Sequence, residues 1–206
     1  MKRNVIFGGM ILAALASFGQ DVKLIAPQTD KGLPAMQAFA ERRSTREYAD
    51  RDLSQQDLSN LLWATMGRNR ADKLTAPSCQ NKQEIRLFVF TATGAYEYMP
   101  ADHSLRLVAE GDHRSKVAGR QAFVNNAPVS LVMVADMEKF GSSDERAMMM
   151  AAVDAGIVSE NACLAAAGLG LATVPRASME VAEIQKLLGL SDLQIPVMNN
   201  PVGYFK

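Results

Sequence analysis

The sequence has few of the residues that build metal centres or cross-linked scaffolds. It contains two cysteines, Cys79 and Cys163, and two histidines, His103 and His113. The wide separation of the cysteines excludes a CxxC-type pair, so we expect free, partly buried thiols, with a single disulfide after export as the alternative. The histidines have no clustered cysteine or acidic partners, and the sequence therefore does not indicate a metal site.

Two further signatures are missing. No GxSxG-like nucleophile turn occurs, which argues against a Ser/His/Asp hydrolase. Lysine and arginine number 22, as do aspartate and glutamate, so the formal net charge is zero. A nucleic-acid-binding surface needs an excess of positive charge. We therefore expect a small-molecule substrate and no nucleic acid partner.

A sustained apolar run occurs at the N-terminus. Lys2 and Arg3 precede an apolar stretch over residues 5–18, which is followed by Gly19. This order of charged, apolar and small residues is typical of a secretory signal peptide, which we place at residues 1–19. The stretch is shorter than the ~20 residues of a membrane helix. We expect an exported, periplasmic protein with no stable membrane insertion after signal removal; an uncleaved anchor and a buried first helix are the alternatives.

The rest of the sequence is long and apolar enough for one globular domain. Hydrophobic residues make up 48% of the sequence, which is enough to build a core. We assign residues 34–206 to this domain, after an extended lead-in over 20–33. The residue patterns predict helices over 34–43, 54–67, 112–124, 142–167 and 179–188, and strands over 85–91, 95–98, 103–108, 129–135 and 171–174. Ser142 and Glu145 form a capping-box pattern that opens the longest helix. Its small residues suit the domain centre or a subunit interface, although an ordinary Ala-rich core helix has the same composition.

The strongest local signal is a cluster of positive charge. Residues 42–46 hold three arginines, Arg42, Arg43 and Arg46, together with Ser44 and Thr45. Arginine presents a planar fork of donors that matches a phosphate, and hydroxyl groups add short contacts. The cluster therefore points to a phosphorylated ligand; the alternative is a solvated helix end.

Four separated segments occur in the order found in one family. They read Arg-Arg-Ser-Thr-Arg at 42–46, Pro-Ser-Cys-Gln-Asn-Lys-Gln at 77–83, Gly-Leu-Gly through Val-Pro over 168–175, and Pro-Val-Gly-Tyr at 201–204. With these segments the chain resembles the FMN-dependent nitroreductase family over residues 34–206. The segments at 61–64 and 94–98 are also similar to the related azoline-type flavin dehydrogenases.

The resemblance implies an α+β, nitroreductase-like fold. Its central, mostly antiparallel sheet is flanked by helices, and a long central helix lies at a homodimer interface that holds FMN. The first segment would bind the phosphate, the second would pair with the flavin edge, and backbone N–H groups after the long helix would lie near flavin N5. The corresponding residues are Arg42, Ser44 and Arg46; Pro77, Ser78 and Asn81; and Pro175, Arg176, Ala177 and Ser178.

Two positions depart from the family pattern. Arg176 stands where glycine is common, so its side chain is expected to face the flavin, an acidic substrate or solvent. Longer members continue to a further basic residue at the phosphate, whereas this sequence ends at Lys206. Either Lys206 substitutes for that residue or the phosphate depends on the first segment.

The resemblance also implies the chemistry. Flavin N5 carries a two-electron hydride transfer to a nitro, quinone or similar acceptor, with NADH or NADPH as the expected donor, and no dedicated catalytic side chain is needed. Nicotinamides are intracellular, so an exported enzyme would need another donor. The alternatives are a flavin dehydrogenase that oxidises a peptide or small metabolite, and an FMN-binding protein without turnover.

Overall fold

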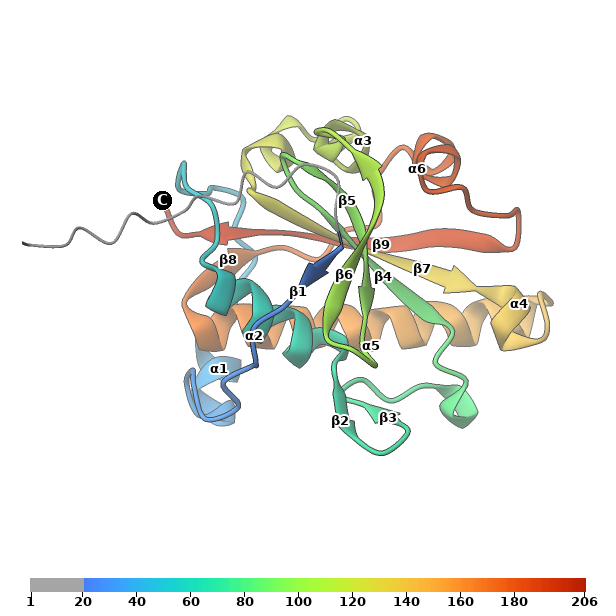
Figure 1. The fold of residues 1–206 in the computed structure, drawn as a ribbon, viewed down its shortest axis with the longest axis horizontal. Coiled ribbons are helices and arrows are strands. Elements are labelled where there is room, and N and C mark those ends of the chain that lie inside the picture. Colours follow the sequence, from blue (N-terminus) through green and yellow to red (C-terminus); the bar gives the residue numbers. More distant parts are fainter. Residues whose placement is uncertain (1–20) are drawn as a thin grey trace, which may run out of the picture.

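The computed structural model describes residues 21–206 and shows an α+β fold built on one large sheet (Figure 1). Residues 1–20, and with them the predicted signal peptide, lie outside the described part. The strands are β1 (Val22–Lys23), β2 (Arg68–Arg70), β3 (Lys73–Leu74), β4 (Ile85–Phe90), β5 (Gly94–Met99), β6 (Ser104–Glu110), β7 (Val129–Asp136), β8 (Leu171–Thr173) and β9 (Gln194–Tyr204). The helices are α1 (Ala35–Glu41), α2 (Gln55–Met66), α3 (Arg114–Ala118), α4 (Met137–Phe140), α5 (Glu145–Leu169) and α6 (Val181–Leu188), with the short 3-10 helices η1 (Cys79–Asn81) and η2 (Ala122–Asn126).

The main sheet has the strand order β1-β6-β5-β4-β7-β9-β8, and all its neighbouring strands are antiparallel. β2 and β3 form a separate hairpin. The interior strand β7 is buried along its whole length, as its continuous apolar sequence predicts. The expected α+β class with an antiparallel sheet is confirmed.

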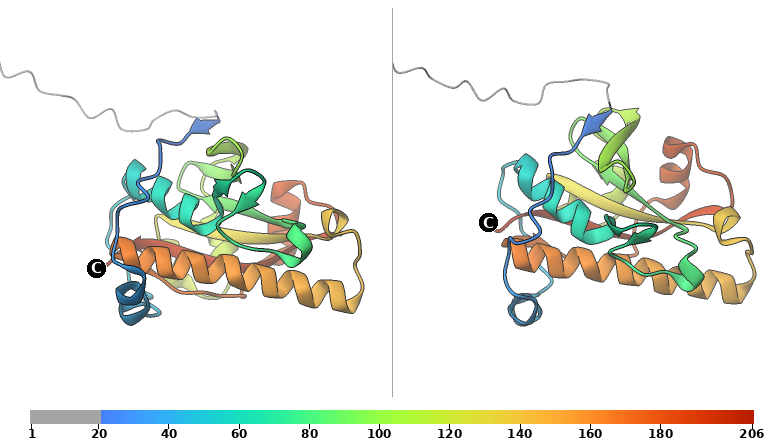
Figure 2. Two further views of the ribbon diagram at one scale, coloured as in Figure 1. Left: turned by 90° about the horizontal axis from the view of Figure 1, so that it is seen from below. Right: turned by 60° about the horizontal axis from the view of Figure 1, so that its bottom comes forward.

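Side chains alternate between two hydrophobic cores, one on each face of the sheet. On β4, Leu87 and Val89 belong to the core that includes α2 and α5, whereas Phe88 and Phe90 belong to the core that includes α3 and α6. This alternation follows from the two-residue period of a strand. Figure 2 shows the helices as layers on opposite sides of the sheet.

Helix α5 lies along the sheet and α2 and is the longest helix in Figure 1. By length and composition it could cross a membrane, yet here Ala151 and Ala155 are fully buried in the core. The helix begins three residues later than predicted, because its cap is Asp144. The Asp144 carboxylate accepts the Ala147 N–H at 2.8 Å, whereas the Ser142 hydroxyl donates to the Asp144 carboxylate and accepts the Asp144 N–H, which precedes the helix. The predicted capping box at Ser142 is therefore wrong.

Two other segments differ from the predictions. The tail from Gln194 forms β9, an 11-residue strand, although it contains Pro196 and Pro201. The register against β7 shifts beside Pro196 and leaves Val197 unpaired, and such a bulge accommodates a residue without an N–H. The helix predicted over 112–124 is split into α3 and η2 at Gly119, which has a φ of 52° that suits glycine.

Candidate functional site

The basic segment 42–46 lies between α1 and α2, against the edge strand β8. Ser44 pairs with Thr173 in an isolated parallel bridge, and the Thr45 N–H donates to the Thr173 carbonyl at 2.9 Å. β8 leads directly into residues 175–178. The structure therefore brings the first predicted segment and the segment after the long helix together.

The arginine side chains of this segment are accessible to solvent. Arg42 is half-buried, and Arg43, Ser44 and Arg46 are exposed. Within residues 21–206, no acidic side chain forms an ion pair with these arginines. Unpaired guanidinium groups on a fixed backbone are suited to binding a phosphate.

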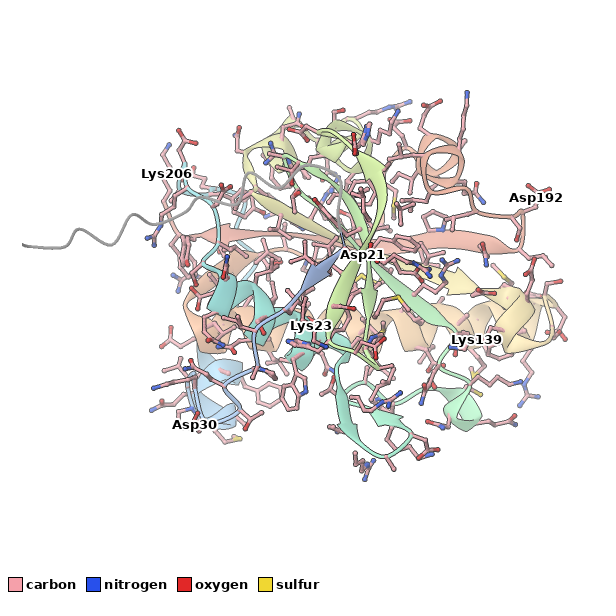
Figure 3. All side chains as sticks on the ribbon, in the orientation of Figure 1. Asp21, Lys23, Asp30, Lys139, Asp192 and Lys206 are labelled. Atoms are coloured by element: carbon pink, nitrogen blue, oxygen red, sulfur yellow. The ribbon has the colours of Figure 1, made fainter. Side chains whose placement is uncertain are left out.

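The C-terminal residues approach the same segment. The Arg43 guanidinium lies 5.0 Å from the ring centre of Phe205, and the Ala49 N–H donates to the Tyr204 carbonyl at 2.9 Å. Lys206 follows directly and is exposed. Figure 3 shows Lys206 at the end of the molecule where β9 finishes. It adds a further cation to this region.

Two cations from separate segments lie near the buried ring of Tyr48. The Tyr48 hydroxyl donates to the Thr45 carbonyl at 3.2 Å. Burial raises the pKa of Tyr48 well above its usual value, while the charges of Arg176 and Arg46 oppose that rise. Tyr48 thus connects the basic segment to the 175–178 segment. Nothing in the sequence singles it out, because one aromatic residue beside a basic cluster is no signal by itself.

The Arg176 side chain is buried, so the alternative that it faces solvent is wrong. Only 7% of the residue is exposed. Its guanidinium donates to the carbonyls of Val117 and Ala118, to Asn199 Oδ1 at 2.6 Å and to Gln121 Oε1 at 2.7 Å. All three guanidinium nitrogens therefore donate to the protein itself, and the side chain ties α3 to β9.

The backbone of residues 175–178 offers two N–H groups. Pro175 has none, and the Arg176 N–H donates to the Asn199 carbonyl at 2.8 Å. Ala177 and Ser178 are exposed, and in the described part of the chain their N–H groups make no hydrogen bond. Such donors can stabilise negative charge that develops on a bound group.

The segment at 77–83 forms a turn beside the middle of α5. The Cys79 N–H donates to the Asp154 carboxylate of α5 at 2.7 Å. The Ser78 hydroxyl accepts the Gln83 N–H at 2.9 Å, which closes the turn. Ser78 is therefore engaged in holding the backbone of its own segment.

The exposed side chains of this turn include Pro77 and Asn81. Asn81 Nδ2 lies 3.4 Å from Asp72 Oδ2, and Asn81 Oδ1 accepts from the Gln83 amide at 3.0 Å. Both contacts are at the surface, where water competes with them. An amide presents a donor and an acceptor together, which is what the edge of a heterocyclic ring requires.

Within one chain, this turn lies far from the other segments. Its anchor Asp154 precedes Gly168 by fourteen residues along α5, which corresponds to about 21 Å at ~1.5 Å per residue. Figure 3 shows the same separation: Lys206 lies toward one end of the long axis and Lys139, which donates to the Gln83 carbonyl, toward the other. The predicted site residues therefore form two separate groups.

Both cysteines are free, as the sequence predicted. Cys79 is half-buried and Cys163 is buried. Burial raises the pKa of the Cys163 thiol to about 11, so this thiol is protonated near neutral pH and is a poor nucleophile.

Comparison with known proteins decides the family. The sequence profile of the nitroreductase family matches residues 39–204. The chain belongs to the nitroreductase family. It is 30% identical over 176 residues to a protein of Methanocaldococcus jannaschii described as a nitroreductase, and the match covers 79% of this chain and 86% of that relative.

Two further matches concern the fold and the reaction class of this nitroreductase-family chain. A crystal structure from Ralstonia eutropha, also described as a nitroreductase, superposes with a TM-score of 0.84 and 31% identity over 91% of this chain and 90% of the other. An FMN reductase [NAD(P)H] of Bacillus subtilis is 25% identical over 187 residues, covering 82% of this chain and 65% of that protein. Together the matches confirm the nitroreductase-like fold and support a flavin oxidoreductase.

Proposed function

We propose that this nitroreductase-family protein is an FMN-dependent oxidoreductase that passes two electrons to a nitro, quinone or similar acceptor. The observation that carries the proposal is the pairing of residues 42–46 with β8. This pairing sets unpaired arginines beside the two free N–H groups of residues 177 and 178. FMN has an anionic phosphate at one end and a ring that gains negative charge on reduction at the other, so both parts of the site suit it.

Arg42 and Arg46 would hold the phosphate, with the Ser44 hydroxyl between them. All three are accessible, and the backbone of this segment is fixed by its bonds to Thr173. Arg43 stacks on Phe205 and so lies beside this group rather than within it. Lys206 would add a positive charge from the C-terminal side. The phosphate would then be held by Lys206 together with residues 42–46 rather than by residues 42–46 alone.

We also propose a homodimer, because α1 and α5, two helices that pack together, each carry exposed apolar side chains. Met149 and Val153 of α5 are 56% and 51% exposed, and Met36 and Phe39 of α1 are 79% and 56% exposed. Exposed apolar side chains on packed helices are typical of an interface. Gly156 of α5, three residues after Val153, is a position at which an added methyl group would touch nothing.

A second copy would also join the separated groups of site residues. The turn at 77–83 lies beside the middle of α5, whereas the basic segment lies beside its C-terminal end. Two α5 helices packed antiparallel would place the turn of the partner next to the basic segment. In that arrangement Ser78 and Asn81 of the turn would face the flavin edge.

The chain itself needs to bind and orient the flavin rather than to donate protons or electrons. When bound, FMN would supply hydride transfer at N5. The N–H groups of Ala177 and Ser178 would stabilise charge on the ring, and the apolar dimer interface would exclude water. NADH or NADPH is the proposed donor, in keeping with the name of the Bacillus subtilis relative. If the chain is exported, as residues 1–19 predict, the donor must instead be one that is present outside the cytoplasm.

The test is an FMN titration of the purified protein and of Arg42→Ala and Arg46→Ala, followed by tryptophan or flavin fluorescence. A hydrogen bond to a charged group contributes ~1.5–3 kcal/mol, so each variant should raise the Kd by roughly 10- to 100-fold. Arg70→Ala, on the exposed β2–β3 hairpin, is the matched control and should bind as the wild type does.

Two results would contradict the proposal. If the wild-type protein takes up no FMN, then FMN is not its cofactor. If both arginine variants bind FMN as tightly as the wild type, then the assigned phosphate site is wrong. With FMN bound, reduction by NADH or NADPH and reoxidation by a nitroaromatic or a quinone identify the donor and the acceptor. Bound flavin without any turnover would favour a binding protein.

A further inference from the structure

Two buried carboxyl groups meet beneath the turn at 77–83. Glu84, the residue before β4, is 0% exposed, and Asp154 of α5 is 5% exposed. Asp154 lines a small cavity together with Gln83 and Ile85, the residues on either side of Glu84, and it lies near enough to raise the pKa of Glu84. In the described part of the chain, neither carboxylate oxygen of Glu84 receives a hydrogen bond from a donor. A carboxylate can only accept, so an ionised Glu84 facing an ionised Asp154 would leave these oxygens unsatisfied.

A single proton shared by the Glu84 and Asp154 carboxyl groups would supply a hydrogen bond between them and remove one of the two charges. Like charges in contact within a protein cannot both ionise at neutral pH without a large cost, and burial adds to it. Burial, and then contact with Asp154, raise the pKa of Glu84 from 4.5 to about 7. The neighbouring cation is Lys139 of α4, which opposes this rise and donates to the Gln83 carbonyl. The adjoining turn adds two titratable groups, Cys79 and Lys82.

Solvent has little room to stabilise a second charge here. The cavity beside Asp154 has a volume of about 10 Å³ and is lined by Pro77, Ser78 and apolar side chains such as Met66 and Val158. That volume is at the lower limit of what one water molecule needs. The proton therefore decides whether the buried Glu84 carboxyl group has a hydrogen-bond partner.

The pair supports a backbone that is strained. Gln80, Asn81 and Gln83 have φ values of 52°, 57° and 51°, in the left-handed region that residues other than glycine rarely adopt. Such a conformation persists only where contacts hold it. One of these contacts is the hydrogen bond from the Cys79 N–H to Asp154, which is 2.7 Å long.

We propose that Glu84 and Asp154 share one proton and thereby position the turn that carries Pro77, Ser78 and Asn81. The protonated Glu84 carboxyl donates to Asp154, and Asp154 in turn accepts the Cys79 N–H. Loss of the proton sets two negative charges against each other and weakens the anchor of the turn. The consequence for FMN rests on the proposed function, whereas the shared proton does not.

The sign of the pH effect follows from the direction of the shift. The pKa of Glu84 is higher in the folded protein than in the unfolded chain, so its contribution to stability is present at low pH and is lost as the pH rises through about 7. A rise from 4.5 to about 7 corresponds to a change of about 300-fold in the folding equilibrium constant. The loss should be complete by about pH 8.

The experiment compares wild type, Glu84→Gln and Asp154→Asn by urea unfolding from pH 5 to pH 9, with hydrogen exchange of the Cys79 amide. Each variant keeps the shape, supplies a permanent N–H donor and removes one charge. We expect wild-type stability to fall progressively from pH 5 to about pH 8, amide protection to fall between pH 6 and pH 8, and flat profiles in both variants. Glu145→Gln, an exposed carboxyl in the first turn of α5, is the matched control and should keep the wild-type fall.

Each outcome tests a different part of the proposal. Identical profiles for wild type and Glu84→Gln would overturn the shared proton, and a fall that persists in Asp154→Asn would show that Glu84 titrates without its partner. If the stability profile behaves as expected but protection of the Cys79 amide does not follow it, the positioning role is wrong. FMN affinity should track amide protection; absence of FMN binding in all proteins at every pH would overturn the proposed function and leave the first two measurements to judge the pair.

Discussion

Replacing Arg176 with methionine should destabilise the fold strongly while leaving the intrinsic FMN affinity almost unchanged. Methionine keeps an unbranched side chain but has no donor. The Val117 carbonyl and Asn199 Oδ1 would lose their hydrogen bonds from Arg176. The Ala118 carbonyl would still accept the Gln121 N–H, so it would remain satisfied.

The expected loss follows from these two orphaned acceptors. Val117 and Asn199 are both 0% exposed, so water cannot replace the guanidinium. A buried acceptor left without a donor costs about 1–3 kcal/mol, so the free energy of unfolding should fall by about 4 kcal/mol. In a domain of this size that corresponds to a decrease of roughly 10 °C in Tm.

Urea unfolding and FMN titration of Arg176→Met would measure both quantities. Arg120→Met is the matched control, because Arg120 is exposed in the neighbouring loop, and its stability should change by less than about 0.5 kcal/mol. If Arg176→Met were as stable as wild type but bound FMN tenfold more weakly, the guanidinium would face the ligand. The structural role derived from its hydrogen bonds would then be wrong.

Two further substitutions test the packing and the assembly. Gly203→Ala would place a methyl group 2.8 Å from Pro128 Cδ and 3.1 Å from the Tyr48 ring; thermal unfolding should show a loss of about 1–3 kcal/mol, and an unchanged Tm would contradict this contact. Val153→Arg should convert the proposed dimer to a monomer in light scattering and weaken FMN binding, because charge would enter the apolar interface. Val181→Arg, at another exposed valine, on α6, is its control and should stay dimeric; dimers in both variants would argue against α5 as the interface.

Local signals in the sequence predicted much of the fold. Ser54 and Gly67 mark the ends of α2 as predicted, because a cap acts on its own first turn and a glycine on its own last turn. The buried strands β4 and β7 also follow from their composition. Ser142 misled because Asp144, two residues on, is also a good cap and lies closer to the helix.

Features that depend on residues distant in the sequence could not be predicted from these local signals. β9 contains prolines, and only its pairing with β7 and β8 reveals it as a strand. The inward direction of Arg176 depends on carbonyls of α3, which lie almost sixty residues away in the sequence. Glu84 and Asp154 each resemble an ordinary surface carboxyl in the sequence, and only the packing of α5 against the start of β4 makes them a buried pair. The family resemblance supplied the candidate site residues, but not their division into two groups within one chain.

The position of β9 has a consequence for the order in which the chain folds. This strand lies between β7 and β8, so until residues 194–204 have been synthesised β7 is paired on one side only, with β4, and β8 has no neighbour. Until then, the apolar edge of β7 is open to pairing with other chains, and β8 has no sheet to join. The basic segment is held by β8, so it too is assembled late. A nascent chain that ends before this strand would thus be prone to aggregation, and its proposed phosphate site would not yet be assembled.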